Sequence, residues 1–423
     1  MRKVLIVAYY WPPAGGPGVQ RWLKFATYLP DFNVEPILYI PENPHYPITD
    51  ESLLKEVPKG IKIYRKPIAE PYKFAAVLSG SKTKRISSGI IRTKKQSVLE
   101  KIFLWIRGNL FIPDARKYWV KPSVDFLTEI IRQEKIDTVI TTGPPHSMHL
   151  IGLGLKQHLD IPWIVDFRDP WTSIGYHKEL RLTKRSREKH KTLEQLVLTS
   201  ADKIVVTSDT TKNEFAQITK KPISVITNGY DTNYQGDAGI DHDFTISHIG
   251  SLLSERNPEI LWKVLSGIVK ENPNFRERLR LQLVGVVSQD VMKSIQKHGL
   301  EDHVNVLGYL SHSEAQKYQQ KSQILLLVEV NSEETEGIIP GKLFEYMAAK
   351  RPILALGPEN WEVKRIISET RTGVVFNYKQ AEHLKKTLLS YFEKYENKQL
   401  HQDSTDISKY SRRELTKQLA EQI

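Results

Sequence analysis

The residues whose types and spacing best suit chemistry lie in the second half of the chain. The run Phe244–Ile249 is typical of a strand, and Gly250, Ser251 and Arg256 follow it. A strand that ends in a glycine turn and leads into a helix brings backbone amides and the positive end of the helix dipole close to an anion. An arginine beside such a turn can bind a diphosphate through two parallel hydrogen bonds. We therefore expect Gly250, Ser251 and Arg256 to contact a ligand that carries a diphosphate.

A second candidate group lies further along the same half. The pair Pro340-Gly341 starts a predicted helix that carries Lys342 in its first turn and Glu345 three residues later, on the same face. The Lys342 ammonium can neutralise a phosphate, and the Glu345 carboxylate can accept two hydrogen bonds from ribose hydroxyls. The alternative interpretation is an ion pair between these two side chains on the surface of the helix.

In the first half, charged side chains stand where a predicted strand ends. Asp166, Arg168 and Asp169 come directly after the apolar residues Trp163–Val165. Charges buried at the edge of a sheet are costly unless they pair with each other or bind something. We expect Asp169 to orient or deprotonate an acceptor hydroxyl and Arg168 to face a phosphate or a sugar. In the alternative interpretation, an Asp–Arg pair only holds the loop.

Two further loops of the first half are candidates for substrate contacts. Gly15 and Gly16 lie between a predicted strand and a predicted helix, but Arg21 takes the third glycine position of the dinucleotide-binding pattern. We expect the two glycines to contact a phosphate or the acceptor, with a plain tight turn as the alternative. His146 begins another predicted helix and could transfer a proton or hydrogen-bond a sugar hydroxyl. The alternative is a histidine with a structural role.

These residues need a framework that positions them, and the sequence predicts one. Short apolar runs alternate with helical patterns along the whole chain, which is typical of βαβ units and parallel sheets. The predicted strands of the first half are Val4–Tyr9, Pro36–Ile40, Thr138–Thr141, Trp163–Asp166, Lys203–Thr207 and Ile223–Asn228. Those of the second half are Phe244–Ile249, Leu281–Val287, Val304–Leu307, Ile324–Val330, Ile353–Leu356 and Val374–Phe376.

The fold class that we predict is α/β, with two Rossmann-like, doubly wound parallel sheets. The first domain covers residues 1–229, the second covers residues 230–395, and residues 396–423 hold a C-terminal helix at Ser411–Ile423. The polar run Gly229–Gly239 is the predicted linker. Doubly wound sheets bind ligands at the carboxyl ends of their strands, so we expect the function in a cleft between the two domains.

Composition excludes several classes of protein. The 423 residues include no cysteine, which excludes disulfides and thiolate metal sites and fits a reducing compartment. No apolar run approaches the roughly 20 residues of a membrane-spanning helix, and the N-terminal apolar run is too short for a signal peptide. We expect a cytoplasmic protein, or one held peripherally on the inner face of the plasma membrane.

The net charge of +12 is concentrated between Tyr72 and Gly108. This segment holds nine basic residues and the single acid Glu100, beside apolar residues such as Phe103 and Trp105. Basic and aromatic residues in one segment suit an anionic membrane surface. A solvated loop followed by an ordinary core helix is the alternative. We expect no nucleic-acid partner, because no nucleic-acid-binding motif accompanies the charge.

Together these motifs resemble the retaining glycosyltransferases of the GT-B fold, in particular the family 4-like group of bacterial surface-polysaccharide synthesis. The resemblance covers nearly the whole chain. It is carried by the Gly15-Gly16 loop, by the turn at Gly250 with Arg256, and most specifically by the run Pro340–Ala355.

The resemblance implies a hexosyltransferase-type enzyme with two substrates. Residues 1–229 would take a glycan or lipid-linked acceptor, and residues 230–395 would bind the UDP- or GDP-linked sugar donor. The C-terminal helix would cross back onto the first domain.

The chain departs from the family pattern at several positions. The family often has two glutamates eight positions apart, but Gly337 stands eight residues before Glu345, and Glu336 is one position off. We place Gly337 in the donor site on this basis. Ser251 stands where many relatives have an arginine, and Arg168 stands where many have a histidine.

The sequence also bears on the mechanism. The only D-x-D pattern in the donor half, Asp241 to Asp243, lies in the predicted linker and does not follow a strand. Preorganised cations and helix amides can stabilise a diphosphate leaving group without a metal. We expect retaining transfer with no metal site and no cofactor. Two other functions remain open, a nucleotide-sugar 2-epimerase of the same fold and a non-catalytic protein that binds an anionic surface.

Overall fold

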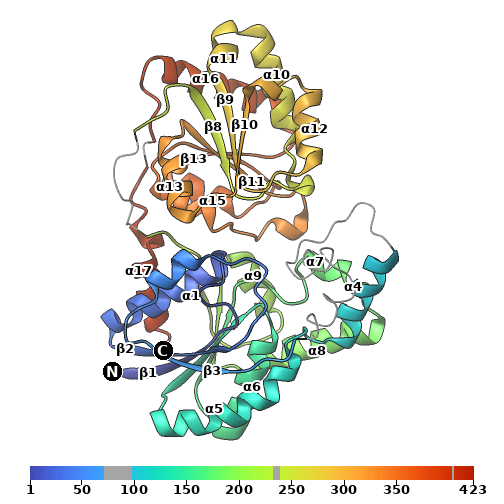
Figure 1. Cartoon of the computed structure of the whole chain (residues 1–423), viewed down its shortest axis with the longest axis vertical. Helices are drawn as coiled ribbons and strands as arrows, with labels where there is room; N and C mark the ends of the chain where they lie inside the picture. Colours follow the sequence, from blue (N-terminus) through green and yellow to red (C-terminus); the bar gives the residue numbers. More distant parts are fainter. Residues whose placement is uncertain (71–97, 232–238, 403) are drawn as a thin grey trace. The chain divides into compact units, whose positions relative to one another are not determined.

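The chain forms two compact units, one of Met1–Thr227 with Arg412–Ile423 and the other of Asn228–Ser411. The computed structural model describes residues 1–70, 98–231, 239–402 and 404–423 (Figure 1). Each unit has its own parallel sheet, which confirms the prediction of two doubly wound α/β halves. Most of the predicted basic segment and most of the predicted linker lie outside the described residues.

The sheet of the first unit has seven parallel strands in the order β3-β2-β1-β4-β5-β6-β7. The strand order reverses between β1 and β4, and in such sheets the crevice at the reversal receives the ligand. Tyr9 follows β1 and Pro144 follows β4, so both lie at this point. The strands are β1 (Arg2–Val7), β2 (Val34–Pro41), β3 (Lys62–Lys66), β4 (Thr138–Gly143), β5 (Trp163–Phe167), β6 (Lys203–Val206) and β7 (Ile223–Val225).

Helices from both ends of the chain pack on this sheet. Leu415 and Leu419 of the C-terminal helix lie in the same buried cluster as Val19 and Trp22 of α1 (Figure 1). The α-helices of this unit are α1 (Pro17–Tyr28), α4 (Val98–Leu110), α5 (Val120–Glu134), α6 (Ser147–Leu159), α7 (Tyr176–Glu179), α8 (Lys184–Ser200), α9 (Asp209–Ala216) and α17 (Arg412–Ala420). The 3-10 helices are η1 (Leu29–Phe32), η2 (Glu51–Glu56) and η3 (Lys117–Trp119).

The second unit repeats the design with six parallel strands in the order β10-β9-β8-β11-β12-β13. Its strands are β8 (Phe244–Ile249), β9 (Leu279–Val284), β10 (Val304–Gly308), β11 (Ile324–Val328), β12 (Ile353–Leu356) and β13 (Gly373–Phe376). Its α-helices are α10 (Glu259–Glu271), α11 (Pro273–Arg278), α12 (Gln289–Lys297), α13 (His312–Lys321), α14 (Lys342–Ala348), α15 (Val363–Thr370) and α16 (Ala381–Glu396). The 3-10 helices are η4 (Ser254–Arg256), η5 (Glu301–His303), η6 (Glu333–Thr335) and η7 (Ser408–Tyr410).

Two strands differ from the sequence-based expectation. The sequence pattern does not predict β3, because three of its five residues are basic and its side chains are exposed or half-buried at the edge of the sheet. The strand β5 runs on to Phe167 and is buried throughout. Asp166 therefore lies inside the strand, and the expectation that all three charged residues follow the strand is wrong for Asp166.

A close approach of helix to sheet fixes the position of α6. A Cβ atom at Gly152 would lie 2.2 Å from Trp163 Nε1 and 2.7 Å from Thr141 Cγ2. These contacts leave no room for a side chain on this face of α6. The N-terminus of α6, with His146 before it, is therefore held at the end of β4.

We predict that Gly152→Ala lowers the free energy of unfolding by about 1–3 kcal/mol, because the added methyl group overpacks the contact with Trp163. Gly267→Ala in α10 is the matched control, since a Cβ at Gly267 meets nothing within 4 Å. That change should be neutral or stabilise the chain by up to about 1 kcal/mol through helix propensity. Equilibrium urea unfolding of the two variants measures the difference, and equal stabilities would contradict the close-packing argument.

Candidate functional site

The turn after β8 is the centre of the candidate site in the second unit. Gly250 has φ 126°, a conformation that residues with a side chain rarely adopt. Its N–H donates to the Val284 carbonyl at 2.8 Å, and the Leu252 N–H donates to the Val286 carbonyl at the same distance. A Cβ at Gly250 would lie 2.6 Å from Lys342 Nζ. Glycine at this position thus lets the Lys342 ammonium come close to the backbone.

Lys342 is the first residue of α14, a short helix that the core holds in place. Tyr346 Oη accepts from the Ile249 N–H at 2.9 Å and lies 3.3 Å from the Ile249 carbonyl, so α14 is tied to the end of β8. Burial and, to a smaller extent, the nearby Arg256 lower the pKa of Lys342 to about 8, while Glu329 and Glu345 oppose the shift. Among the described residues, no carboxylate forms an ion pair with Lys342.

Arg256 lies near Lys342 but has a partner of its own. Its Nε is 2.9 Å from Glu329 Oε1, and its Nη2 is 3.2 Å from Glu329 Oε2. The Glu329 side chain is only 1% exposed and also accepts from the Val330 N–H at 2.9 Å. This bidentate pair fixes the guanidinium beside the turn. Arg256 belongs to the 3-10 helix η4, and α10 begins three residues later at Glu259, in agreement with the helix start predicted beside Arg256.

The other predicted donor residues lie on the same edge of this sheet. Glu345, on α14, accepts from Gln319 Nε2 at 3.0 Å. Ser251 is exposed, directly after Gly250. Gly337 lies in the half-buried loop before α14, which is held by a hydrogen bond of 2.8 Å from Trp361 Nε1 to the Ile338 carbonyl. The structure brings Gly250, Arg256 and Lys342 together.

In the first unit, both oxygens of the buried Asp166 carboxylate have partners. Its Oδ1 is 2.8 Å from Arg21 Nη2, and its Oδ2 accepts from Trp22 Nε1 at 2.9 Å and from Thr142 Oγ1 at 2.8 Å. Arg21 Nη1 also donates to the Thr227 carbonyl at 2.7 Å. An Asp–Arg pair does hold this region, but its arginine is Arg21 of α1. The residue in the unmatched third glycine position thus has a structural role.

Arg168 and Asp169 lie at the carboxyl end of β5. Arg168 donates from Nε to the Gly143 carbonyl at 3.2 Å and from Nη2 to the Pro144 carbonyl. A Cβ at Gly18 would clash with the Arg168 guanidinium, so this side chain also packs against the start of α1. Burial raises the pKa of Asp169, and the adjacent Arg168 opposes the increase. Asp169 therefore has the raised basicity expected of a group that interacts with a hydroxyl.

His146 precedes α6 and is buried against an aromatic ring. Its imidazole stacks on Trp171 with a centroid separation of 4.8 Å and an interplanar angle of 3°. Neither ring nitrogen has a hydrogen-bond partner among the described residues. Burial holds the pKa of His146 well below its usual range and lowers that of His149 to about 3. Both imidazoles are therefore neutral near pH 7.

The predicted glycine loop is held by its neighbours. The Gly15 N–H donates to the Ile48 carbonyl at 3.0 Å, and the Asp50 N–H donates to the Pro13 carbonyl at 2.7 Å. Gly16, with φ 105°, occupies the N-cap of α1 and is exposed. Its backbone conformation requires glycine, and its exposure leaves the loop accessible at the end of β1.

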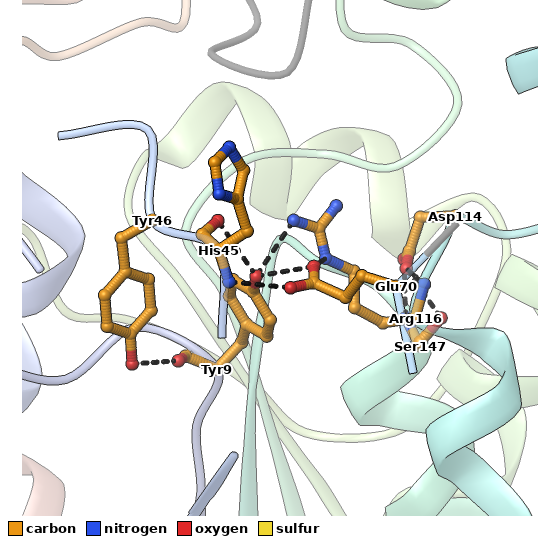
Figure 2. Close-up of polar contacts among 7 residues, drawn as sticks. All are labelled: Tyr9, His45, Tyr46, Glu70, Asp114, Arg116 and Ser147. Atoms are coloured by element: carbon orange, nitrogen blue, oxygen red, sulfur yellow. Dashed lines mark hydrogen bonds and ion pairs between the residues drawn. The ribbon is translucent and has the colours of Figure 1, made fainter. Parts of the chain in front are cut away.

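A buried polar network at the end of β1 is absent from the sequence-based prediction (Figure 2). Tyr9 Oη donates to Glu70 Oε1 at 2.7 Å, Arg116 Nε is 3.0 Å from the same oxygen, and Arg116 Nη2 donates to Tyr9 Oη at 3.0 Å. Glu70 Oε2 accepts from the His45 N–H at 2.7 Å, while the His45 imidazole points away from the network in Figure 2. Burial raises the pKa of Tyr9.

Asp114 completes the same region by capping α6. Its Oδ2 accepts from the Ser147 N–H at 2.9 Å and its Oδ1 from Ser147 Oγ at 2.8 Å (Figure 2). The members of this network are far apart in the sequence, so no local pattern predicts their contacts. The only sequence signal for it is that polar residues follow an apolar strand. The network places buried, hydrogen-bonded polar groups at the point where the strand order of the first sheet reverses.

Two properties of the described residues bear on other functions. None of the described helices is both long enough and apolar enough to cross a membrane. In the part of the chain that the structure describes, no three His, Cys, Asp or Glu side chains come together as metal ligands.

Models of known protein families match both halves of the chain. Residues 92–234 match the model of Glycosyltransferase Family 4, and residues 232–413 match the model of Glycosyl transferases group 1. No curated protein sequence matches the chain.

Solved structures agree on the fold. A TarM variant from S. aureus, in complex with Fondaparinux, alpha-GlcNAc-glycerol and UDP, superposes with a TM-score of 0.59 at 12% identity, over 100% of this chain and 99% of that one. Sucrose-phosphate synthase from Thermosynechococcus elongatus gives 0.58 at 14% identity, over 99% and 95%. WaaG, a glycosyltransferase involved in lipopolysaccharide biosynthesis, gives 0.55 at 14%, over 99% and 99%.

Proposed function

Because the chain belongs to the GT-B glycosyltransferases, with a family 4 first half and a group 1 second half, we propose that it builds a cell-surface polysaccharide. In this proposal it moves a sugar from a UDP- or GDP-linked donor to a glycan or lipid-linked acceptor. The observation that carries the proposal is the pair of cations at the glycine turn after β8.

The donor diphosphate would bind between Lys342 and Arg256. Lys342 has no ion-pair partner among the described carboxylates, so an incoming diphosphate would supply the missing negative charge. Arg256 is held in place by Glu329, and its remaining N–H groups would donate to the diphosphate. Gly250 and Ser251 would offer backbone contact, Glu345 would accept hydrogen bonds from the ribose hydroxyls, and Gly337 would lie near the donor sugar.

The chemical step would release the nucleoside diphosphate, whose charge grows as the glycosidic bond breaks. Cations that are fixed before the reaction stabilise this charge without reorganisation. Retention of the anomeric configuration follows from the family resemblance. In the first unit, Asp169 and the neutral His146 would orient or deprotonate the acceptor hydroxyl, Arg168 would face its sugar or phosphate, and Gly15 and Gly16 would line its approach.

The nucleotide assignment is tested on two variants of α14. We predict that Lys342→Met and Glu345→Ala each weaken the binding of UDP or GDP by about tenfold to a hundredfold, because each removes a hydrogen bond to or from a charged group. Isothermal titration calorimetry with both nucleotides measures the effect. Lys263→Met on the exposed face of α10 is the control and should leave the affinity unchanged. Unchanged affinity in Glu345→Ala would remove the ribose assignment.

The mechanism is tested by chelation. We predict that slow hydrolysis of the nucleotide-sugar donor to free nucleoside diphosphate continues in excess EDTA, because protein cations stabilise the leaving group. Chromatography of the products also separates the alternatives. A 2-epimerase would give an altered sugar nucleotide, and a non-catalytic protein would give no product. Loss of hydrolysis in EDTA that a divalent cation restores would disprove metal-independent transfer.

An exposed stripe on α4 favours a place at an anionic membrane. Val98, Ile102 and Trp105 recur at helical spacing and are 71%, 49% and 42% exposed, with the exposed Lys101 beside them. The opposite face is buried through Leu104. Apolar groups beside basic side chains suit the boundary between anionic headgroups and acyl chains. We propose that this stripe holds the enzyme at the inner face of the plasma membrane, near a lipid-linked acceptor.

The membrane proposal predicts that Trp105→Ser weakens binding to vesicles containing phosphatidylglycerol by about tenfold, because the indole no longer enters the bilayer boundary. Co-sedimentation measures the binding. Tyr118→Ser, at another exposed aromatic residue of the first unit, is the matched control. Equal binding of wild type and Trp105→Ser, or equal binding to neutral phosphatidylcholine vesicles, would disprove this role of α4.

A further inference from the structure

A buried histidine on β8 contacts the lysine of the donor site. His248 is fully buried within the strand. Its Nδ1 is 3.0 Å from the Leu326 carbonyl on the neighbouring strand β11, and its Nε2 is 3.4 Å from Lys342 Nζ. The imidazole therefore bridges the core of the sheet and the cation at the glycine turn.

The hydrogen bonds of His248 determine which nitrogen carries the proton. A carbonyl oxygen can only accept, so Nδ1 must donate its hydrogen to Leu326. Burial and the charges of Lys342 and Arg256 hold the pKa of His248 well below its usual range, although the backbone at Leu326 and Ser251 acts in the opposite direction. The imidazole is thus neutral, and Nε2 presents a lone pair to the Lys342 ammonium.

We propose that His248 is a positioning residue for the donor diphosphate, whose neutral Nε2 accepts a hydrogen bond from Lys342 Nζ and holds the ammonium beside Gly250 in its charged form. This inference rests on the proposed role of Lys342 in donor binding. The sequence pattern gives no signal for His248, because β8 also holds the polar residues Thr245 and Ser247.

The charges that face Lys342 explain why a neutral acceptor suits this position. Arg256 from η4 disfavours the ammonium, while Glu329 after β11 and Glu345 from α14 favour it. A further carboxylate would stabilise the ammonium but would repel the incoming diphosphate. The imidazole stabilises the ammonium through a hydrogen bond and leaves its full positive charge available for the ligand.

Two substitutions separate the two hydrogen bonds of the imidazole. In His248→Asn, the amide nitrogen lies near the position of Nδ1 and can still donate to Leu326, but nothing reaches Lys342. In His248→Gln, the longer side chain places an amide oxygen near the position of Nε2, so the acceptor for Lys342 is retained. Thermal unfolding of both variants establishes that they fold.

The first measurement needs no ligand. The rate at which acetic anhydride acetylates Lys342 is followed against pH by mass spectrometry of the full-length protein after digestion. The wild-type midpoint should lie near 8, the pKa to which burial brings Lys342. In His248→Asn the midpoint should fall by about one pH unit, which corresponds to about 1.4 kcal/mol. In His248→Gln it should stay near the wild-type value.

The second measurement is the affinity for UDP and for GDP between pH 7 and pH 9.5. Binding needs the ammonium, so affinity should fall as the pH rises through the pKa of Lys342. The fall should come about one pH unit earlier in His248→Asn, which makes binding about threefold weaker at pH 7.5. His248→Gln should follow the wild type.

The outcomes distinguish the inference from the function on which it rests. An unchanged acetylation midpoint in His248→Asn, or an equal fall in both variants, overturns the role of His248. A shifted midpoint in a protein that binds neither nucleotide supports the contact between His248 and Lys342 and overturns the proposed donor site.

Discussion

The close approach of the Lys342 ammonium to the backbone at Gly250 is the contact on which the candidate site of the second unit depends. A side chain at residue 250 would meet the ammonium, and the backbone there has φ 126°. Gly285, after β9, repeats the requirement, since its Cβ would lie 2.8 Å from the carbonyl group of Gly250. The Gly285 N–H in turn donates to the Gly308 carbonyl at 2.6 Å. Positive-φ glycines thus end three adjacent strands, and the one at residue 250 leaves room for the Lys342 ammonium.

The two units treat buried charge in different ways. In the first unit, Arg21 pairs with Asp166 and Arg116 pairs with Glu70. These cations have carboxylate partners inside the protein, and the pairing offsets the cost of burying each charge and leaves little of it for a ligand. In the second unit, Arg256 has such a partner in Glu329, but Lys342 is supported by the neutral His248. A half-buried cation without a counter-ion is costly, and an anionic ligand that supplies the counter-ion removes that cost.

The sequence predicts much of the fold and part of the site. Physical reasons explain why the other features are not predicted. The strand β11 is a continuous apolar run and β8 alternates bulky apolar with smaller polar residues, so both are recognisable, and they bring Gly250, Arg256 and Lys342 to one edge. The basic edge strand β3 lacks this signal. The network of Tyr9, Glu70 and Arg116 depends on pairs separated by 61 and 107 residues, which no local pattern encodes. The sequence pattern shows Arg21 only as a mismatch to the third glycine of the dinucleotide-binding pattern, because its partner Asp166 comes much later in the chain.

The same pairing of buried charges determines which groups of the first unit are available to a ligand at the point where its strand order reverses. The buried carboxylates of Asp166 and Glu70 pair with Arg21 and Arg116, and His146 and His149 are neutral because burial lowers their pKa values. Besides Arg168 and Asp169, the groups that remain for a ligand there are uncharged: the exposed backbone of Gly16 and half-buried aromatic rings such as Tyr10. Such groups select hydroxyls and sugar faces by hydrogen bonding and stacking rather than by charge. An acceptor sugar suits these groups, while the diphosphate suits the cations of the second unit.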